Sequence, residues 1–256
     1  MEFVAASLPM TRDGFAGTAG SLGVSAPEVW AVLSVETSAC GFLPDRRPTI
    51  LFERHVFSRL TGGRFNDGDI SDPAPGGYGP LGAAQYNRLN RALLLDRTAA
   101  LMSASWGLAQ LMGENYSAIG FAGVNEMVAA MSQSEDSQLG AFAAFLKSTG
   151  LDGPLRAHDW TSFARGYNGP GYSKNQYDVR LRGDFQKYSV GALPDIEIRS
   201  VQMCLIYRGF HPGTVDGVEG QLTTAALQDF QKSVGLPPTG VIDPATMALL
   251  KPEALV

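Results

Sequence analysis

The segment from Ser25 to Glu36 places a carboxylate at the end of an apolar helix face. Ser25 and Glu28 form a capping-box pattern with proline in the first turn, so we expect a helix to begin near residue 26. The residues that precede Glu36 by seven, four and three positions share its helical face and are all apolar: Val29, Val32 and Leu33. We therefore expect the Glu36 side chain to lie among apolar neighbours.

This environment suits a group that donates a proton near neutral pH. Gly41 is a natural end for the helix, so Glu36 stands in the last turn, where unpaired carbonyl groups make the local potential negative. Desolvation and this potential both disfavour the carboxylate, and we expect its pKa to rise above the reference value of about 4.3. Such a carboxylic acid can act as a general acid. The alternative is a solvated glutamate beside the core stripe.

The composition is that of a soluble globular protein. The chain has 256 residues, of which 45% are hydrophobic and 18% charged, which suffices for one large or two smaller domains. With a formal net charge of −5 and no basic cluster longer than Arg46-Arg47, we expect no nucleic-acid partner. The sequence shows neither a long apolar span nor a signal-peptide pattern, so we expect no membrane insertion. Cys40 and Cys204 are too few for a disulfide framework, which fits synthesis in a reducing cytoplasm.

Hydrophobic periodicity predicts a mainly helical chain. The helices expected before residue 190 cover 10–22, 26–38, 83–101, 106–113, 124–132, 136–149, 159–166 and 174–188. Residues 61–82 are rich in glycine and proline, and we interpret them as a functional loop that forms one wall of a cleft, or else as a mobile connection. The loop does not match the calcium-binding pattern at Asn66, Asp67, Asp69 and Asp72, so we expect no metal and no cofactor.

A second unit follows the small-residue stretch from Val190 to Pro194, which is typical of a linker. This unit contains a weak internal repeat, in which Val215-Asp216-Gly217 and Val241-Ile242-Asp243 each follow a glycine-containing turn and precede a helix. The apolar positions around these turns predict a bundle of about three helices.

Glycines, aspartates and core residues of this second unit occur together in one pattern: Val201-Gln202, Arg208-Gly209-Phe210, Val215-Asp216-Gly217, Phe230-Gln231, Thr239-Gly240 and Asp243. The pattern resembles the small helical peptidoglycan-binding domain attached to many cell-wall hydrolases. The resemblance implies wall binding without chemistry. Tyr207 and Phe210 offer rings that can stack on a glycan, although either fits a core position equally well.

Four short motifs follow one another along the first 190 residues: Val35-Glu36 with Gly41-Phe42, Ile50-Leu51-Phe52-Glu53, Gly107-Leu108-Ala109-Gln110, and Tyr167-Asn168-Gly169-Pro170-Gly171-Tyr172. This order resembles the lysozyme-like superfamily, including lytic transglycosylases and goose-type lysozymes. It is most similar to the phage N-acetylmuramidase family of endolysins. The resemblance implies a lysozyme-like helical fold and cleavage of a glycosidic bond, with Glu36 as the acid.

The same resemblance raises the question of a second carboxylate. Animal lysozymes carry an aspartate two positions before the glycine that corresponds to Gly107, and this sequence has Ser105 there. Transglycosylases also tend to carry a neutral residue at that position. Glu53 is our candidate for a replacement carboxylate. Its alternative is a structural ion pair with one of three arginines, Arg46, Arg47 or Arg54.

The remaining motif residues are candidates for substrate binding. Gln110 and Asn168 offer amides that suit N-acetyl and hydroxyl groups. Tyr167 could hydrogen-bond near the acid and pack on a sugar ring, while Tyr172 closes the same motif and Ser105 precedes Gly107. As alternatives, Gln110 caps a turn and Tyr167 belongs to the core.

Other catalytic schemes fit less well. Cys40 with His55 could suggest a cysteine peptidase, but Cys40 lacks a nucleophile signature and we interpret it as a core residue. The three histidines have no metal-binding spacing, which argues against a zinc enzyme. Among the tryptophans we expect Trp106 near the cleft.

The sequence therefore predicts a mainly α protein with two domains. Residues 1–190 form a lysozyme-like catalytic domain, and residues 196–256 a peptidoglycan-binding bundle. We expect a monomer that cuts the β-1,4 bond between N-acetylmuramic acid and N-acetylglucosamine. It would be made in a host cytoplasm and reach the wall through a holin-type pore, or alternatively as an injected effector. The alternative functions are a lytic transglycosylase and a catalytically silent wall-binding or virion protein.

Overall fold

The computed structural model describes residues 2–36 and 40–251, without the side chains of Glu36 and Lys174. Residues 37 and 38, at the end of the helix expected over 26–38, lie outside this described part. The helices are α1 (Arg12–Leu22), α2 (Ala26–Glu36), α3 (Arg54–Leu60), α4 (Gln85–Leu93), α5 (Arg97–Met102), α6 (Val124–Met131), α7 (Glu135–Ser148), α8 (Asp152–Arg156), α9 (Trp160–Asn168), α10 (Tyr177–Val190), α11 (Ile196–Tyr207), α12 (Gln221–Ser233) and α13 (Pro244–Leu250). The strands are β1 (Ile50–Phe52), β2 (Ala104–Trp106) and β3 (Leu111–Met112), and short 3-10 turns cover Gly82–Ala84, Gly113–Asn115 and Tyr172–Asn175.

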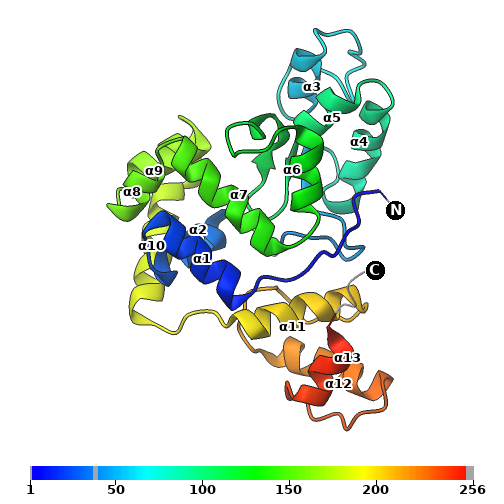
Figure 1. The fold of residues 1–256 in the computed structure, drawn as a ribbon, viewed down its shortest axis with the longest axis vertical. Coiled ribbons are helices and arrows are strands. Elements are labelled where there is room, and N and C mark those ends of the chain that lie inside the picture. Colours follow the sequence, from blue (N-terminus) through cyan, green and yellow to red (C-terminus); the bar gives the residue numbers. More distant parts are fainter. Residues whose placement is uncertain (1, 37–39, 252–256) are drawn as a thin grey trace.

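The helices form three groups (Figure 1). Helices α1, α2 and α8–α10 lie together on one side, α3–α6 lie on the other, and α7 runs between these groups. Helices α11–α13 form a separate group next to the N-terminal segment. The mainly α fold expected from the sequence is confirmed.

Helix α2 begins as the capping box predicts. The backbone N–H and the hydroxyl of Ser25 donate to Glu28 Oε2 over 3.2 and 2.6 Å. Val29, Val32 and Leu33 are all buried, and α10 packs along α2. The apolar face that was expected to lead to Glu36 is therefore present.

The helix predicted over residues 106–113 is wrong. Strands β2 and β3 form an antiparallel hairpin that pairs Ser105 with Met112 and Trp106 with Leu111, and β1 pairs with the other edge of β2. The hairpin turn contains Gly107 and Gln110 with φ of +70° and +48°, which no α-helix tolerates. The apolar residues at helical spacing here belong to the hairpin, in which Leu108, Ala109 and Leu111 are buried.

Further differences from the predicted helices occur within residues 54–60 and 83–101. The helix expected over 83–101 is interrupted, because Asp96 caps a new helix by accepting a hydrogen bond from the Ala99 N–H over 2.9 Å. Helix α3 was not predicted, since its seven residues carry too short a pattern to read.

The loop over residues 61–82 is tied to α4 by ion pairs. Asp69 lies 2.9 Å from Arg88 Nε, and Asp67 lies 3.1 Å from Arg91 Nη2. Asp67 Oδ1 also accepts backbone N–H groups of residues 69–71. These contacts favour an ordered loop over the mobile alternative.

The weak repeat of the C-terminal unit corresponds to two buried glutamines in equivalent roles. Gln202 and Gln231 each accept a loop N–H and donate to the threonine of the following helix, with partners Gly217 and Thr223 for the first and Gly240 and Thr246 for the second. Each glutamine thus links two helices through the loop between them, and α11–α13 form a small helical domain.

Within residues 2–36 and 40–251, no helix has the length and apolar character needed to cross a membrane. In the same described part, His, Cys, Asp and Glu side chains form no group of three or more that could hold a metal ion.

Candidate active site

A groove of about 430 Å³ lies where the sheet meets the segment that follows α2. Its lining is formed by Cys40, Phe42–Pro44, Thr49–Leu51, Gly107, Leu108 and Gln110. Leu81 and Gly82 at the end of the long loop also line it, which agrees with the interpretation of this loop as part of a cleft wall. Ile206 of α11 is a further lining residue, so the C-terminal domain reaches the same groove.

The hairpin turn holds Gln110 in the groove wall. Its Nε2 donates to the Gly107 carbonyl over 2.8 Å and to the Thr49 carbonyl over 3.2 Å, while its Oε1 accepts from the Ser105 hydroxyl over 2.8 Å. Gln110 therefore caps the turn, as the structural alternative proposed, and at the same time lines the groove. Ser105 is buried and acts as its hydrogen-bonding support.

Tyr167 supports the same turn from α9. Its hydroxyl donates to the Ala109 carbonyl over 2.9 Å, and its ring packs against Phe142, Phe145 and Phe163. This position combines a core ring with a polar contact at the turn. Asn168 is the last residue of α9.

Tyr172 does not contact this turn in the way that Tyr167 does. Its half-buried ring packs against the main core, with the Arg165 guanidinium 6.0 Å from the ring centroid. The structure thus brings Ser105, Gln110 and Tyr167 together around one turn, whereas the contacts of Tyr172 belong to the core.

The end of α2 is close in sequence to the groove lining. Glu36 is the last residue of this helix, and Cys40, four residues later, already lines the groove. The Glu36 side chain lies outside the described part of the structure, so its role and its raised pKa stay predictions.

Glu53 directly follows β1 and stands just before α3, and it does not belong to the groove lining, which includes Thr49–Leu51 of the same segment. Its Oε2 lies 3.1 Å from His55 Nδ1. Burial, followed by the charge and hydrogen bond of Glu53, raises the pKa of the Tyr78 hydroxyl, so this tyrosine is a second neighbour.

The arginines considered as partners of Glu53 make other contacts. Arg47 pairs with Asp45 and Arg54 with Asp72, while Arg46 donates to the Ala6 carbonyl. The ionisable neighbour of the Glu53 carboxylate is instead His55.

Trp106 does not lie in the cleft. Its side chain is completely buried, and its indole N–H donates to the Leu101 carbonyl over 3.1 Å. In a strand, neighbouring side chains point to opposite faces, so Trp106 faces the core when Ser105 faces Gln110. The expectation that Trp106 stands near the substrate is wrong for this reason.

Cys40 has the environment of an unreactive thiol. Burial, with a smaller contribution from the charge of Glu135, raises the pKa of Cys40 to about 11. Its Sγ donates to the Phe42 carbonyl. A thiol in this state is a poor nucleophile at neutral pH, which agrees with its interpretation as a structural residue.

The two aromatic candidates for wall binding are engaged in internal contacts. The Tyr207 hydroxyl donates to the Ser7 carbonyl over 2.9 Å, between the C-terminal and N-terminal domains. Phe210 packs edge-on against Phe230 in the core of α11–α13. Their contacts favour the core alternative for both rings.

Two polar residues at the start of α7 were missed by the sequence analysis. Glu135 and Gln138 are completely buried and bind the backbone of Gly41 and Leu108, which lie at the groove. A signal was available, because both residues share the helical face of Leu139 and Phe142, where polar side chains need buried partners.

Comparisons with known proteins agree with this architecture. The sequence model of the N-acetylmuramidase family matches residues 25–189, and the model of a peptidoglycan binding domain matches residues 195–250. The crystal structure of the Burkholderia AP3 phage endolysin superposes with a TM-score of 0.66 at 38% identity, covering 71% of each chain. The OxPP cycle protein OpcA of Nostoc punctiforme is 31% identical over 96 residues, which cover 32% of this chain and 21% of that protein. This chain thus matches only about a fifth of the length of that curated relative.

The chain thus combines a region that matches the N-acetylmuramidase family with a small helical domain that matches a peptidoglycan binding domain. The chain belongs to the N-acetylmuramidase family.

Proposed function

We propose that this protein cleaves the β-1,4 bond between N-acetylmuramic acid and N-acetylglucosamine, with Glu36 as general acid. The observation that carries the proposal is the groove lined by Cys40, Gly107 and Gln110, because Cys40 stands only four positions after Glu36, the last residue of α2. A glycan strand bound in this groove would run past the acid helix. Proton donation to the leaving oxygen is the step that a glycosidase requires of such a carboxylic acid.

The proposed binding roles rest on the family motifs and on the turn that carries Gln110. Gln110 lines it, and Ser105 and Tyr167 hold the turn on which Gln110 stands. We propose that Asn168 and Tyr172 complete the substrate-binding side at the end of α9. Residues 1–190 would form the catalytic domain, and residues 196–256 the domain that binds the wall, acting in a monomer.

Glu53 is proposed as the second carboxylate, and hydrolysis as the outcome. A carboxylate that faces Glu36 would activate water or hold a glycosyl intermediate, which leaves a reducing N-acetylmuramic acid end. Without it, the C6 hydroxyl of the sugar can intercept the cation and give the 1,6-anhydro product of a transglycosylase. The match of residues 25–189, which include Glu53, to the N-acetylmuramidase family supports hydrolysis. Full activity of Glu53→Gln would remove Glu53 from the mechanism.

The biological setting proposed is host lysis by a phage endolysin, released to the wall through a pore formed by a partner protein. The similarity to the Burkholderia AP3 phage endolysin supports this setting over an injected effector. Addition of the protein to permeabilised Gram-negative cells should lower their turbidity. A protein that binds sacculi but leaves the turbidity unchanged would instead be the catalytically silent alternative.

A further inference from the structure

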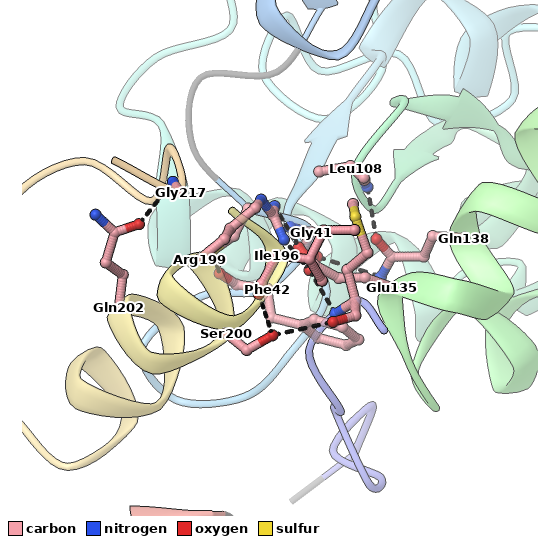
Figure 2. Close-up of polar contacts among 12 residues, drawn as sticks. Gly41, Phe42, Leu108, Glu135, Gln138, Ile196, Arg199, Ser200, Gln202 and Gly217 are labelled. Atoms are coloured by element: carbon pink, nitrogen blue, oxygen red, sulfur yellow. Dashed lines mark hydrogen bonds and ion pairs between the residues drawn. The ribbon is translucent and has the colours of Figure 1, made fainter. Parts of the chain in front are cut away.

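A buried ion pair connects the wall-binding domain to the catalytic domain (Figure 2). Glu135 at the start of α7 is completely buried, and Arg199 of α11 is 3% exposed. Arg199 binds the carboxylate with both terminal nitrogens, Nη2 to Oε1 over 2.9 Å and Nη1 to Oε2. Such a bidentate pair is stable in the interior only while both charges are present.

The carboxylate of Glu135 has further partners in the catalytic domain. Its Oε1 accepts from the Gly41 N–H over 2.8 Å, and its Oε2 accepts from the Met10 N–H over 3.0 Å. Burial alone would raise the pKa of Glu135, but the Arg199 charge and these hydrogen bonds outweigh it and hold the pKa below its usual range. Glu135 is therefore ionised, and its charge is used to hold the backbone of Gly41.

Gln138, on the same face of α7, forms hydrogen bonds to both Gly41 and the hairpin turn. Its Oε1 accepts from the Leu108 N–H over 2.7 Å, and its Nε2 donates to the Gly41 carbonyl over 3.4 Å. The side chain passes so close to Gly41 and Gly107 that an added Cβ would lie 1.8 and 2.5 Å from it. Gly41 is thus held at both its N–H and its carbonyl (Figure 2), and its neighbours Cys40 and Phe42 line the groove.

Apolar and polar contacts around the ion pair keep α11 in place. Phe42, which follows Gly41, packs with Met203 and Val215 of the C-terminal domain. The Ser200 hydroxyl donates to the Met10 carbonyl over 3.0 Å. Ile206, two turns beyond Arg199 on α11, lines the groove itself.

From these contacts we propose that the C-terminal domain is part of the framework of the catalytic centre in addition to being a wall anchor. Arg199 is a positioning residue: it neutralises Glu135, which fixes Gly41 and with it the groove wall that follows Glu36. This inference rests on the proposed function, because it assumes that the groove beside α2 is the site of cleavage. A domain that acts only as a tether would leave cleavage of small soluble substrates unchanged.

The test uses the full chain and soluble, uncross-linked glycan fragments prepared from peptidoglycan, for which wall binding is not needed. Arg199→Met should lower kcat on the order of 10- to 100-fold, because a displacement near 1 Å at a site can have an effect of that size. Arg199→Lys should recover part of this loss by retaining the charge. The control Arg12→Gln breaks the exposed ion pair between Arg12 and Asp195 at the same interface and should leave kcat unchanged.

The pH profile separates positioning from general destabilisation. In Arg199→Met no arginine neutralises the buried Glu135, and burial should then raise the pKa of this carboxyl. The activity of the variant should therefore fall as the pH rises through that pKa. The double variant Arg199→Met with Glu135→Gln has no buried charge and should not show this fall. Wild-type kcat and an unchanged pH profile in Arg199→Met would overturn the proposal. If Arg199→Met does not fold, wild-type kcat in both Arg199→Lys and Glu135→Gln would overturn it equally.

Hydrogen exchange gives a readout that does not depend on activity. The Gly41 amide should exchange slowly in the wild type and in Arg12→Gln, and much faster in Arg199→Lys. Equal exchange in all three proteins would overturn the coupling even if the enzyme is active. Failure of the wild type to cleave any glycan would contradict the proposed function, while the exchange rate of Gly41 would still decide the coupling.

Discussion

Replacing Gly107 with alanine tests the close packing that holds the groove wall. An alanine Cβ at this position would lie 2.5 Å from Gln138 Cδ and 2.9 Å from Gln138 Cγ. The residue also has a φ of +70°, where an L-residue costs about 1–2 kcal/mol. Overpacking of a filled interior adds about 1–3 kcal/mol, so the free energy of unfolding should fall by about 2–5 kcal/mol.

The two contributions can be separated by a matched variant. Gly120 also has a positive φ, +92°, but an added Cβ there meets nothing within 4 Å. Gly120→Ala should therefore show the backbone cost alone. Denaturation with urea gives both free energies, and their difference measures the contact with Gln138. If Gly107→Ala is no more destabilising than Gly120→Ala, the argument that Gln138 packs tightly under the turn is refuted.

Two further predictions concern residues that support the site. Tyr167→Phe keeps the aromatic packing but leaves the Ala109 carbonyl without its donor, and should lower stability by about 1 kcal/mol in thermal unfolding; an unchanged melting temperature would exclude that bond as a support. Folding lowers the pKa of Glu135, burial opposing the shift and Arg199 driving it. Its contribution to stability is therefore complete above the unfolded pKa of about 4.3 and is lost as the pH falls through the lower folded value. The melting temperature of Glu135→Gln should depend less on pH than that of the wild type in this acid range, and parallel curves would contradict the assignment.

The sequence predicted the elements whose signals are local. The capping box at Ser25 and Glu28 placed the start of α2, and glycine-rich turns between apolar stripes predicted the C-terminal helices. The hairpin of β2 and β3 was missed because its turn needs a positive φ at Gln110, and a positive φ cannot be predicted from a non-glycine residue type.

Contacts between residues far apart in the sequence could not be predicted from hydrophobic periodicity. Glu135 and Arg199 are 64 residues apart, and isolated charged residues are expected on a surface unless a partner is known. Ser105 and Gln110, in contrast, stand close together in sequence, and the family resemblance named both as site residues, although the sequence predicted a helix where the structure has the turn that joins them. The structure adds the reason why glycine occupies positions 41 and 107, which is the passage of the Gln138 side chain.

The central claim is that Glu36 is the acid of a muramidase, and purified sacculi test it most directly. Wild-type protein and Glu36→Gln should be compared by the rate of release of soluble muropeptides and by mass spectrometry of the products. The amide is nearly isosteric but cannot donate the proton, so the rate should fall about 100-fold or more at unchanged folding by circular dichroism. Wild-type products should carry reducing N-acetylmuramic acid ends. Retention of more than about a tenth of the rate by a folded Glu36→Gln would contradict the role of Glu36, and predominantly 1,6-anhydro products would contradict hydrolysis.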